Sequence, residues 1–347
     1  LPLLDADSLS ELDQSVEDYY IGTSGYQFGS VRLLNDGTLY RTIKTRSWHN
    51  ATARLLYGAR GSAYSDLGII FKGVVRNPRI DDESLEIETR DERMNFREIP
   101  FNHCWTEEFP YLEETNIGQP KPIILGRQRG VVPLRVDPVN FTYLFHDTGV
   151  GEYDSLDVVY RAGKKLDSGD YAENGDGTFT LGEDPGNDIV TCDVTGLRCD
   201  YDTSTPTFSD NGADILYWLL VRMNGLNPGA LIISTFNDLK ARRTQHVGYT
   251  IKAAIDSLRL IQMLQRSLVF QFLPTPEGRY GAYCYDNTVP AGTTKIRDEQ
   301  IDDFCRYYET DTAHSRVVIK YGQDPATGVW KAVEYRNTKT RYLYGDE

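Results

Sequence analysis

The stretch Gly118-Gln119-Pro120-Lys121-Pro122-Ile123-Ile124-Leu125-Gly126 decides how this chain is organised. Pro120 and Pro122 each fix their own φ angle and hold the preceding residue extended. We therefore expect residues 119–125 to enter a sheet as a stiff strand. This strand leads from a β-rich N-terminal region into a compact run of short strands and tight turns, so it marks a domain boundary.

That compact run follows directly. Apolar and β-branched segments at residues 155–160, 176–181 and 188–196 predict strands, and Ala162-Gly163-Lys164 predicts a tight turn. We expect residues 118–205 to form an inserted β-hairpin module.

The N-terminal region, residues 1–117, has the period-two pattern of β-structure. Asn35-Asp36-Gly37 separates two apolar runs, at 30–34 and 38–43, and predicts a hairpin because Asp-Gly readily takes positive φ. Residues 71–75 and 83–91 predict a further strand pair, separated by Arg76-Asn77-Pro78-Arg79 to Asp82. In the second strand apolar and charged residues alternate, as in a half-buried strand.

The third region, residues 206–347, contains the predicted helices. Ser209 or Asn211 can cap a helix that ends near Gly225, and two more helices are predicted at 235–242 and 251–265. Hairpins are predicted from residues 268–272 with 279–285, and from 316–321 with 329–335. The predicted fold class is therefore β-rich α+β.

This order of segments resembles the tail hub, or baseplate hub, proteins of long-tailed bacteriophages. The residues that carry the resemblance are the proline-containing segment 118–126, Asp193-Val194-Thr195-Gly196 at the end of the module, the strand pair 71–75 and 83–91, and the segments 213–220 and 247–251. Together they cover most of the chain.

The resemblance implies a structural virion protein that is not an enzyme. It implies two tail-tube-like β modules, the inserted module between them and helices packed outside. The family forms a homotrimer at the distal end of the tail tube. Two similar β modules in each subunit would match such a threefold ring to a sixfold tube. The implied partners are the tail tube or distal tail protein, tip or fibre proteins and the tape measure protein, in a virion tail assembled in the host cytoplasm.

The charge of the chain is acidic, with 51 Asp and Glu residues against 37 Lys and Arg residues and a formal net charge of −14. Such a balance argues against a surface that grips nucleic-acid phosphates. It is compatible with a channel through which DNA passes without adhering, and equally with a charge that only keeps the protein soluble. Stable membrane anchoring is not expected, because no run approaches about 18 consecutive apolar residues. The chain opens on Leu1-Pro2-Leu3 without a signal-like segment.

Two places in the sequence resemble metal or cofactor sites. Asn174, Asp176, Gly177 and Glu183 fall at positions 3, 5, 6 and 12 of a calcium loop, but Ala172 occupies position 1 and a strand-turn-strand explains the same residues. An iron–sulfur site could involve Cys192 and Cys199. The chain has five cysteines and no Cys-x-x-Cys pair, which favours buried reduced thiols. No cofactor or metal ligand is predicted.

Catalytic groups were sought in the same way, and no catalytic residue is predicted. The histidines lack metal-ligand spacing, and His103 and Cys104 are expected to point to opposite faces of a strand, which favours a structural histidine. Adjacent acids, at 81–82, 107–108, 113–114 and 302–303, read as solvated surface groups. The alternative function is a carbohydrate-binding or cell-wall-degrading phage tail component. Tyrosine clusters at 19–20, 283–285, 307–308 and 342–344 are candidates for subunit contacts.

Overall fold

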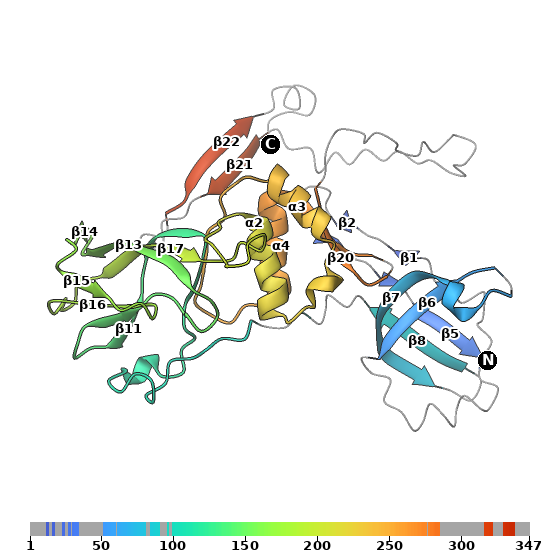
Figure 1. Ribbon diagram of the computed structural model, residues 1–347, viewed down its shortest axis with the longest axis horizontal. Helices are drawn as coiled ribbons and strands as arrows, with labels where there is room; N and C mark the ends of the chain where they lie inside the picture. The colour runs from blue at the N-terminus through green and yellow to red at the C-terminus, as the bar shows by residue number, and fades with distance from the viewer. Residues whose placement is uncertain are drawn as a thin grey trace.

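A computed structural model describes residues 51–59, 61–80, 84–90, 96, 99–275, 277–284, 316–321 and 329–336, together with the strands between residues 12 and 34. Figure 1 shows the helices in the middle of the molecule, the inserted module on one side, an N-terminal sheet on the other, and a separate hairpin above them. The fold is β-rich α+β, as the sequence predicted. None of the described helices is long and apolar enough to cross a membrane.

The N-terminal sheet is antiparallel and has the strand order β5 (Ser30–Leu34), β8 (Ser84–Arg90), β7 (Gly68–Ile80), β6 (Thr52–Tyr57). Leu85 and Thr89 of β8 are buried while Glu88 is exposed, as the alternation predicted, whereas Glu86 and Ile87 are both partly buried. Two short pairs precede this sheet: β1 (Leu12–Asp13) with β4 (Gln27–Phe28), and β2 (Val16–Glu17) with β3 (Thr23–Ser24). The predicted partner of residues 30–34, at 38–43, lies outside the described residues.

One prediction for this sheet was wrong. Residues 76–79 were expected to separate two strands, but β7 continues through them to Ile80. The register between β7 and β8 shifts between Arg76 and Arg79, so this part of the strand is irregular. Pro78 has no N–H to give to a ladder, and such an irregularity accommodates it within a long strand.

The inserted module is larger than the small hairpin unit that the sequence predicted. It contains two antiparallel four-stranded sheets. The first has the order β10 (Arg127–Val131), β17 (Val190–Leu197), β13 (Tyr153–Arg161), β14 (Lys164–Lys165). The second has the order β11 (Leu134–Asp137), β12 (Thr142–Leu144), β16 (Thr178–Leu181), β15 (Tyr171–Glu173). Side chains of both sheets share one core, in which the ring of Phe145 lies 4.9 Å from that of Tyr153.

Strand β9 (Ile123–Leu125) connects this module to the body of the protein. The predicted strand at 119–125 is therefore present only at its end, since Pro120 and Pro122 precede the regular ladder. Ile124 packs into the core of the module, whereas Ile123 and Leu125 pack into the central core. Alternation along an extended chain thus makes β9 a wall shared by two cores.

The partner of β9 corrects a second prediction. Ile251 was assigned to the start of a helix, but residues Tyr249–Ile251 form β18, which pairs antiparallel with β9. The helix α4 begins later, at Ser257, where Asp256 accepts a hydrogen bond from Leu258 N at 2.7 Å. A strand of three residues is too short to show a period that distinguishes it from the first turn of a helix.

The central core is built from helices and one hairpin. The helices are α2 (Gly212–Trp218), which continues into the π-turn η5 (Leu219–Met223), α3 (Ile233–Arg242) and α4 (Ser257–Leu268). The hairpin pairs β19 (Phe270–Pro274) with β20 (Tyr280–Cys284), as predicted. Asn211 is the residue that caps α2, because its side chain accepts from Ala213 N at 2.9 Å.

The last described element is a second predicted hairpin, β21 (Arg316–Tyr321) with β22 (Lys331–Arg336). In Figure 1 its two red strands stand apart from the helical body. Short 3-10 turns complete the described elements: η2 (Tyr64–Asp66), η4 (Glu114–Asn116) and η6 (Pro228–Ala230).

Candidate functional site

The calcium-like segment forms a closed hairpin turn between β15 and β16. Asp176 Oδ1 accepts hydrogen bonds from Thr178 N at 3.0 Å and from Thr178 Oγ1 at 2.6 Å. Asn174 Nδ2 donates to Thr178 Oγ1 at 2.8 Å. Gly177 has φ 85°, and a Cβ there would collide with His146 O. The strand-turn-strand interpretation therefore accounts for Asn174, Asp176 and Gly177, since Asp176 Oδ1 and Asn174 Nδ2 bond within the turn itself.

The cysteines proposed for an iron–sulfur site lie in different cores. Cys192 packs inside the module and Cys199 in the central core. Cys192 Sγ lies 3.7 Å from Val131 O, and Cys199 Sγ lies 3.4 Å from Ser209 O. Burial raises the pKa of both thiols, so they stay protonated near neutral pH.

His103 and Cys104 differ in exposure as the strand argument predicts. Cys104 is fully buried, and burial raises the pKa of its thiol to about 11, although nearby Lys121 acts in the opposite direction. His103 is exposed, with its ring 6.3 Å from that of Trp105, and its structural role stays a prediction.

His146 is the histidine that the fold encloses. Its Nδ1 accepts a hydrogen bond from Ile124 N at 3.1 Å, and its Nε2 therefore donates to Gly151 O at 3.0 Å. Burial lowers the pKa of His146 to about 4, which keeps the ring neutral. The side chain thus connects β9 to the loop that precedes β13. Nothing in the sequence near His146 indicated this role.

The described acid pairs lie on the surface. Glu107, Glu108, Glu113 and Glu114 are exposed, and Glu108 Oε1 pairs with Lys121 Nζ at 2.5 Å. The pairs 81–82 and 302–303 lie outside the described residues. Of the tyrosine clusters, Tyr283 is described, and it is 37% exposed.

The sequence did not predict one histidine–carboxylate pair, because its members lie far apart in the chain. His246 Nδ1 lies 2.9 Å from Asp210 Oδ2, and Arg127 Nε lies 3.8 Å from the same oxygen. A cavity of about 240 Å³ adjoins them, lined also by Val247 and Gly248. No Ser, Thr or Cys is among the residues that line this cavity, so the pair lacks a nucleophile to activate.

A partly buried ion cluster joins the loop after β17 to two helices. Lys240 Nζ lies 2.8 Å from Asp200 Oδ1, 2.9 Å from Asp202 Oδ2 and 3.0 Å from Asp214 Oδ1. Asp214 has no exposed side-chain surface, and it also accepts a hydrogen bond from Ser209. Burial alone would lower the pKa of Lys240, but the hydrogen bonds to the carboxylates outweigh it and raise that pKa. The ammonium group therefore remains charged and holds the loop in place.

Above this cluster lies the junction cleft, a cavity of about 600 Å³ between the module and the helices. Its walls are residues 148–152, residues 198–206 and the side chains of Tyr217, Trp218 and Arg222 from α2 and η5. The ring of Tyr217 stacks on that of Tyr201, with centroids 4.7 Å apart. Arg198 is fixed at one wall by Glu152 and Asp154, each at 3.2 Å. The cleft thus combines aromatic, hydroxyl-bearing and charged residues from three segments of the chain.

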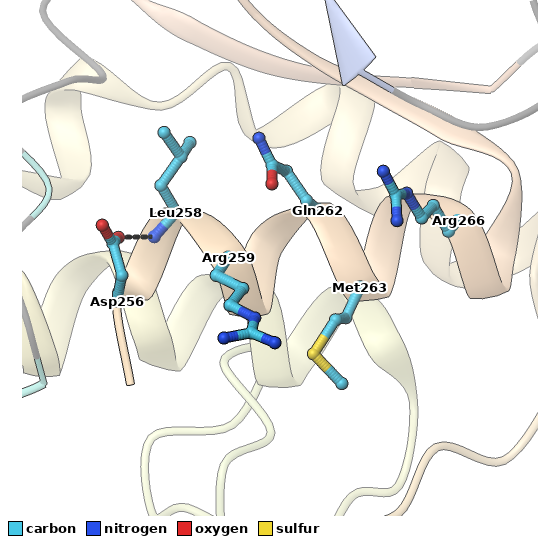
Figure 2. A pocket seen from close by; sticks show the side chains of 6 residues that line it. All are labelled: Asp256, Leu258, Arg259, Gln262, Met263 and Arg266. Carbon is cyan, nitrogen blue, oxygen red and sulfur yellow. Dashed lines mark hydrogen bonds between the residues drawn. The ribbon is translucent and has the colours of Figure 1, made fainter. Parts of the chain in front are cut away.

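The outer side of α4 carries a hollow of about 590 Å³, lined by Asp256, Leu258, Arg259, Gln262, Met263 and Arg266. Figure 2 shows Arg259 and Met263 pointing to one side of the helix, and Leu258 and Gln262 to the other. All six residues belong to α4 and its cap, so the hollow is an open surface of one helix.

The β21–β22 hairpin has two chemically different faces. Directly opposed residues share a face, and the face alternates along each strand. Ile319 and Val333 are opposed, and with Tyr335 they form an apolar face that ends at Lys331. The side chains of Ile319, Val333 and Tyr335 are 57%, 51% and 63% exposed. The other face carries Val318 opposite Glu334, which pairs with Arg316 at 3.0 Å. An amphipathic hairpin thus exposes its apolar face.

Comparison with known proteins gives no assignment. No protein-family model matches the chain, and no curated protein matches its sequence.

Proposed function

We propose that this chain is a structural subunit of a bacteriophage tail tip, the hub that forms a homotrimeric ring at the distal end of the tail tube. The observation that carries the proposal is the exposed apolar face of the β21–β22 hairpin. An isolated two-stranded hairpin is marginally stable in water and needs packing against something else. A hairpin with this face is suited to a subunit contact.

The charge distribution favours a second copy of this chain as the partner of the hairpin. The two strands carry four basic residues, Arg316, Lys320, Lys331 and Arg336, and one acidic residue, Glu334, whereas the whole chain has a net charge of −14. The positive hairpin therefore complements the acidic remainder of a neighbouring copy. Each subunit can give its hairpin to the next, which closes a ring when the rotation is 120°.

The path of the chain also supports the proposal. The module enters through β9 and leaves through β17, and Gly196 N of β17 donates to Gly126 O just after β9 at 2.9 Å. A Cβ at Gly196 would lie 2.5 Å from Ile124 O, so the two strands approach as closely as a glycine permits. An insertion whose ends meet in this way agrees with the inserted module that the hub resemblance implies.

In this proposal the ring contacts the tail tube or distal tail protein on one side and tip or fibre proteins on the other. The tape measure protein and the DNA pass through it. The acidic net charge suits a lumen to which DNA does not adhere. The proposed role is assembly, without catalysis.

Matched substitutions on the two faces of β21 test the subunit contact. Ile319→Asp places a carboxylate on the apolar face, and we expect it to weaken self-association more than about tenfold, since a buried isoleucine contributes about 1.5–3 kcal/mol. Val318→Asp lies one residue away on the charged face and should leave a trimer intact. Light scattering after size exclusion measures both. A monomeric wild-type chain, or a trimer that survives Ile319→Asp, would contradict the proposal.

The alternative, a carbohydrate-binding tail component, is favoured by one observation, the aromatic and hydroxyl-lined junction cleft. Binding is the part of that alternative that the cleft supports, because the described acid pairs lie outside it. Incubation with host polysaccharide or peptidoglycan distinguishes the two candidates: turnover would favour a degrading enzyme, and inertness with copurification in tail tubes would favour the hub.

A further inference from the structure

We propose that the junction cleft binds an acidic saccharide, a sugar that carries a carboxylate. The inference goes beyond the hub proposal and does not require a ring, because every residue in the argument belongs to one subunit.

The first argument is a set of hydrogen-bond donors without protein acceptors. Within the described part of the chain, neither the indole N–H of Trp218, the hydroxyl of Tyr217 nor the guanidinium of Arg222 has a hydrogen bond or ion pair. By contrast, Tyr201 donates its hydroxyl to Asn237 Oδ1 at 2.8 Å. The cleft therefore offers donors that a ligand rich in acceptors can satisfy.

Trp218 places one of these donors at the cleft wall. Its side chain is 5% exposed, and its Nε1 would lie 3.8 Å from a Cβ at Gly151, another residue of the wall. A ligand oxygen at this point can accept from the indole N–H.

The second argument is charge. Four charged residues line the cleft, and three of them are already paired: Glu152 with Arg198, and Asp200 with Lys240 at 2.8 Å. Arg222 is the remaining one, and a planar guanidinium pairs best with a carboxylate or phosphate. The ligand should therefore present an anionic oxygen at η5 and neutral acceptors deeper in the cleft.

The third argument is the chemistry of the walls, which favours a sugar over a peptide. Hydroxyl groups of Thr148, Thr203, Ser204, Thr205 and Tyr217 line the cleft, and its aliphatic lining is confined to Val150 and Pro206. Thr203 Oγ1 donates to Thr205 O at 2.7 Å, so its oxygen is left to accept from a ligand hydroxyl. The volume, about 600 Å³, lies within the range of small-molecule sites, roughly 300–1,000 Å³.

Nuclear magnetic resonance of ¹⁵N-tryptophan in the full chain tests the proposal directly. The chain has four tryptophans, and Trp218→Phe identifies the indole signal of Trp218 by its loss. The probes are trigalacturonic acid and sialyllactose, with maltotriose as the neutral sugar, acetate as the simple anion and triglutamate as the acidic peptide. We expect saturable shifts of the Trp218 signal with an acidic sugar, and none with maltotriose or with acetate at the same concentration.

Substitutions then identify the groups that bind. Arg222→Gln should lower the affinity at least tenfold, which corresponds to the loss of one charged hydrogen bond. Tyr217→Phe removes one hydroxyl, keeps the ring stack, and should lower the affinity severalfold. Arg259→Gln, on the outer side of α4, is the matched control and should bind like the wild type. Arg222 and Arg259 are exposed and Tyr217 is partly exposed, so these three variants should fold even if Trp218→Phe does not.

Several results would overturn the proposal: no shift with either acidic sugar, equal shifts with acetate or triglutamate, or unchanged affinity in Arg222→Gln. Ile319→Asp separates this proposal from the ring, since that variant should lose self-association and still bind the sugar.

Discussion

At the scale of single residues, Lys240 is the cation that contacts three carboxylates, those of Asp200, Asp202 and Asp214. It neutralises Asp214, whose side chain is fully buried at the start of α2, and it orders the loop that forms one wall of the junction cleft. Removing one member of a buried ion pair leaves an uncompensated charge, which costs far more than the pair itself contributes.

We therefore expect Lys240→Met to lower the free energy of unfolding by about 3–5 kcal/mol. Arg242→Met is the control on the same helix: Arg242 Nε pairs with Asp238 Oδ1 at 2.6 Å, and both side chains are exposed. Such surface pairs contribute about 0–1 kcal/mol. Urea denaturation measures both variants, and equal losses would show that the buried cluster does not matter.

His146 should make the free energy of unfolding depend on pH, and the direction of the change follows from its pKa. Its pKa falls from 6.5 in a free chain to about 4 in the fold, because burial disfavours the charged ring. Between these values the unfolded chain binds a proton that the folded chain does not, so stability falls as pH falls. From pH 6.5 to 5 this contribution amounts to about 2 kcal/mol.

The measurement is the free energy of unfolding as a function of pH. His146→Gln should remove this part of the acid destabilisation. His246→Gln changes a histidine whose side chain is 83% exposed, so this variant should retain the acid destabilisation. An unchanged acid profile in His146→Gln would contradict the assignment.

At the scale of elements, the β15–β16 turn is the segment on which a dependence of stability on calcium would rest. Its carboxylate and amide groups bond to Thr178 and Thr180 within the hairpin. We expect chelation to leave the melting temperature unchanged. Asp176→Ala should cost about 1–2 kcal/mol with or without chelator, through its lost hydrogen bonds.

Glu183→Ala is the discriminating variant, because Glu183 would supply the last ligand of a calcium loop. Its carboxylate makes one long contact, 3.9 Å to Arg161, and is 90% exposed. We expect no effect on stability. A fall in melting temperature on chelation that Ca²⁺ restores would show that the turn does hold a cation.

The elements that the sequence predicted are those whose pattern is local. Strands near 155–161 and 190–197 carry long β-branched runs, and α2 has both a cap and an apolar face, so propensity and burial agree. The elements that were predicted wrongly depend on strands that lie elsewhere in the sequence. Ile251 becomes a strand because β9 lies beside it, and Pro78 stays within β7 because the register of β8 shifts around it.

The candidate sites were less predictable than the elements, for the same reason. Trp218 and Tyr217 read as ordinary apolar positions of a helix, and nothing in the sequence places them against residues 148–152 and 198–206. The exposed face of the last hairpin is different. Strands were predicted there, but alternation does not reveal that the apolar side chains stay exposed.

At the scale of the whole molecule, β9 joins two cores and the β21–β22 hairpin extends from the body (Figure 1). In the proposed ring, the hairpin of each subunit packs on the next, and acidic residues face the lumen. Electrostatic repulsion between wall and DNA is screened over about 10 Å at 0.1 M salt, so only residues that line the channel can act.

The most direct test of the ring is an electron cryo-microscopy map of the tail tip from particles that contain this chain. The account predicts three copies around the tube axis, each with Ile319 and Val333 packed against a neighbour, and a channel lined mainly by Asp and Glu. Six copies around the axis, hairpins that contact no other copy, or a channel lined mainly by Lys and Arg would contradict it.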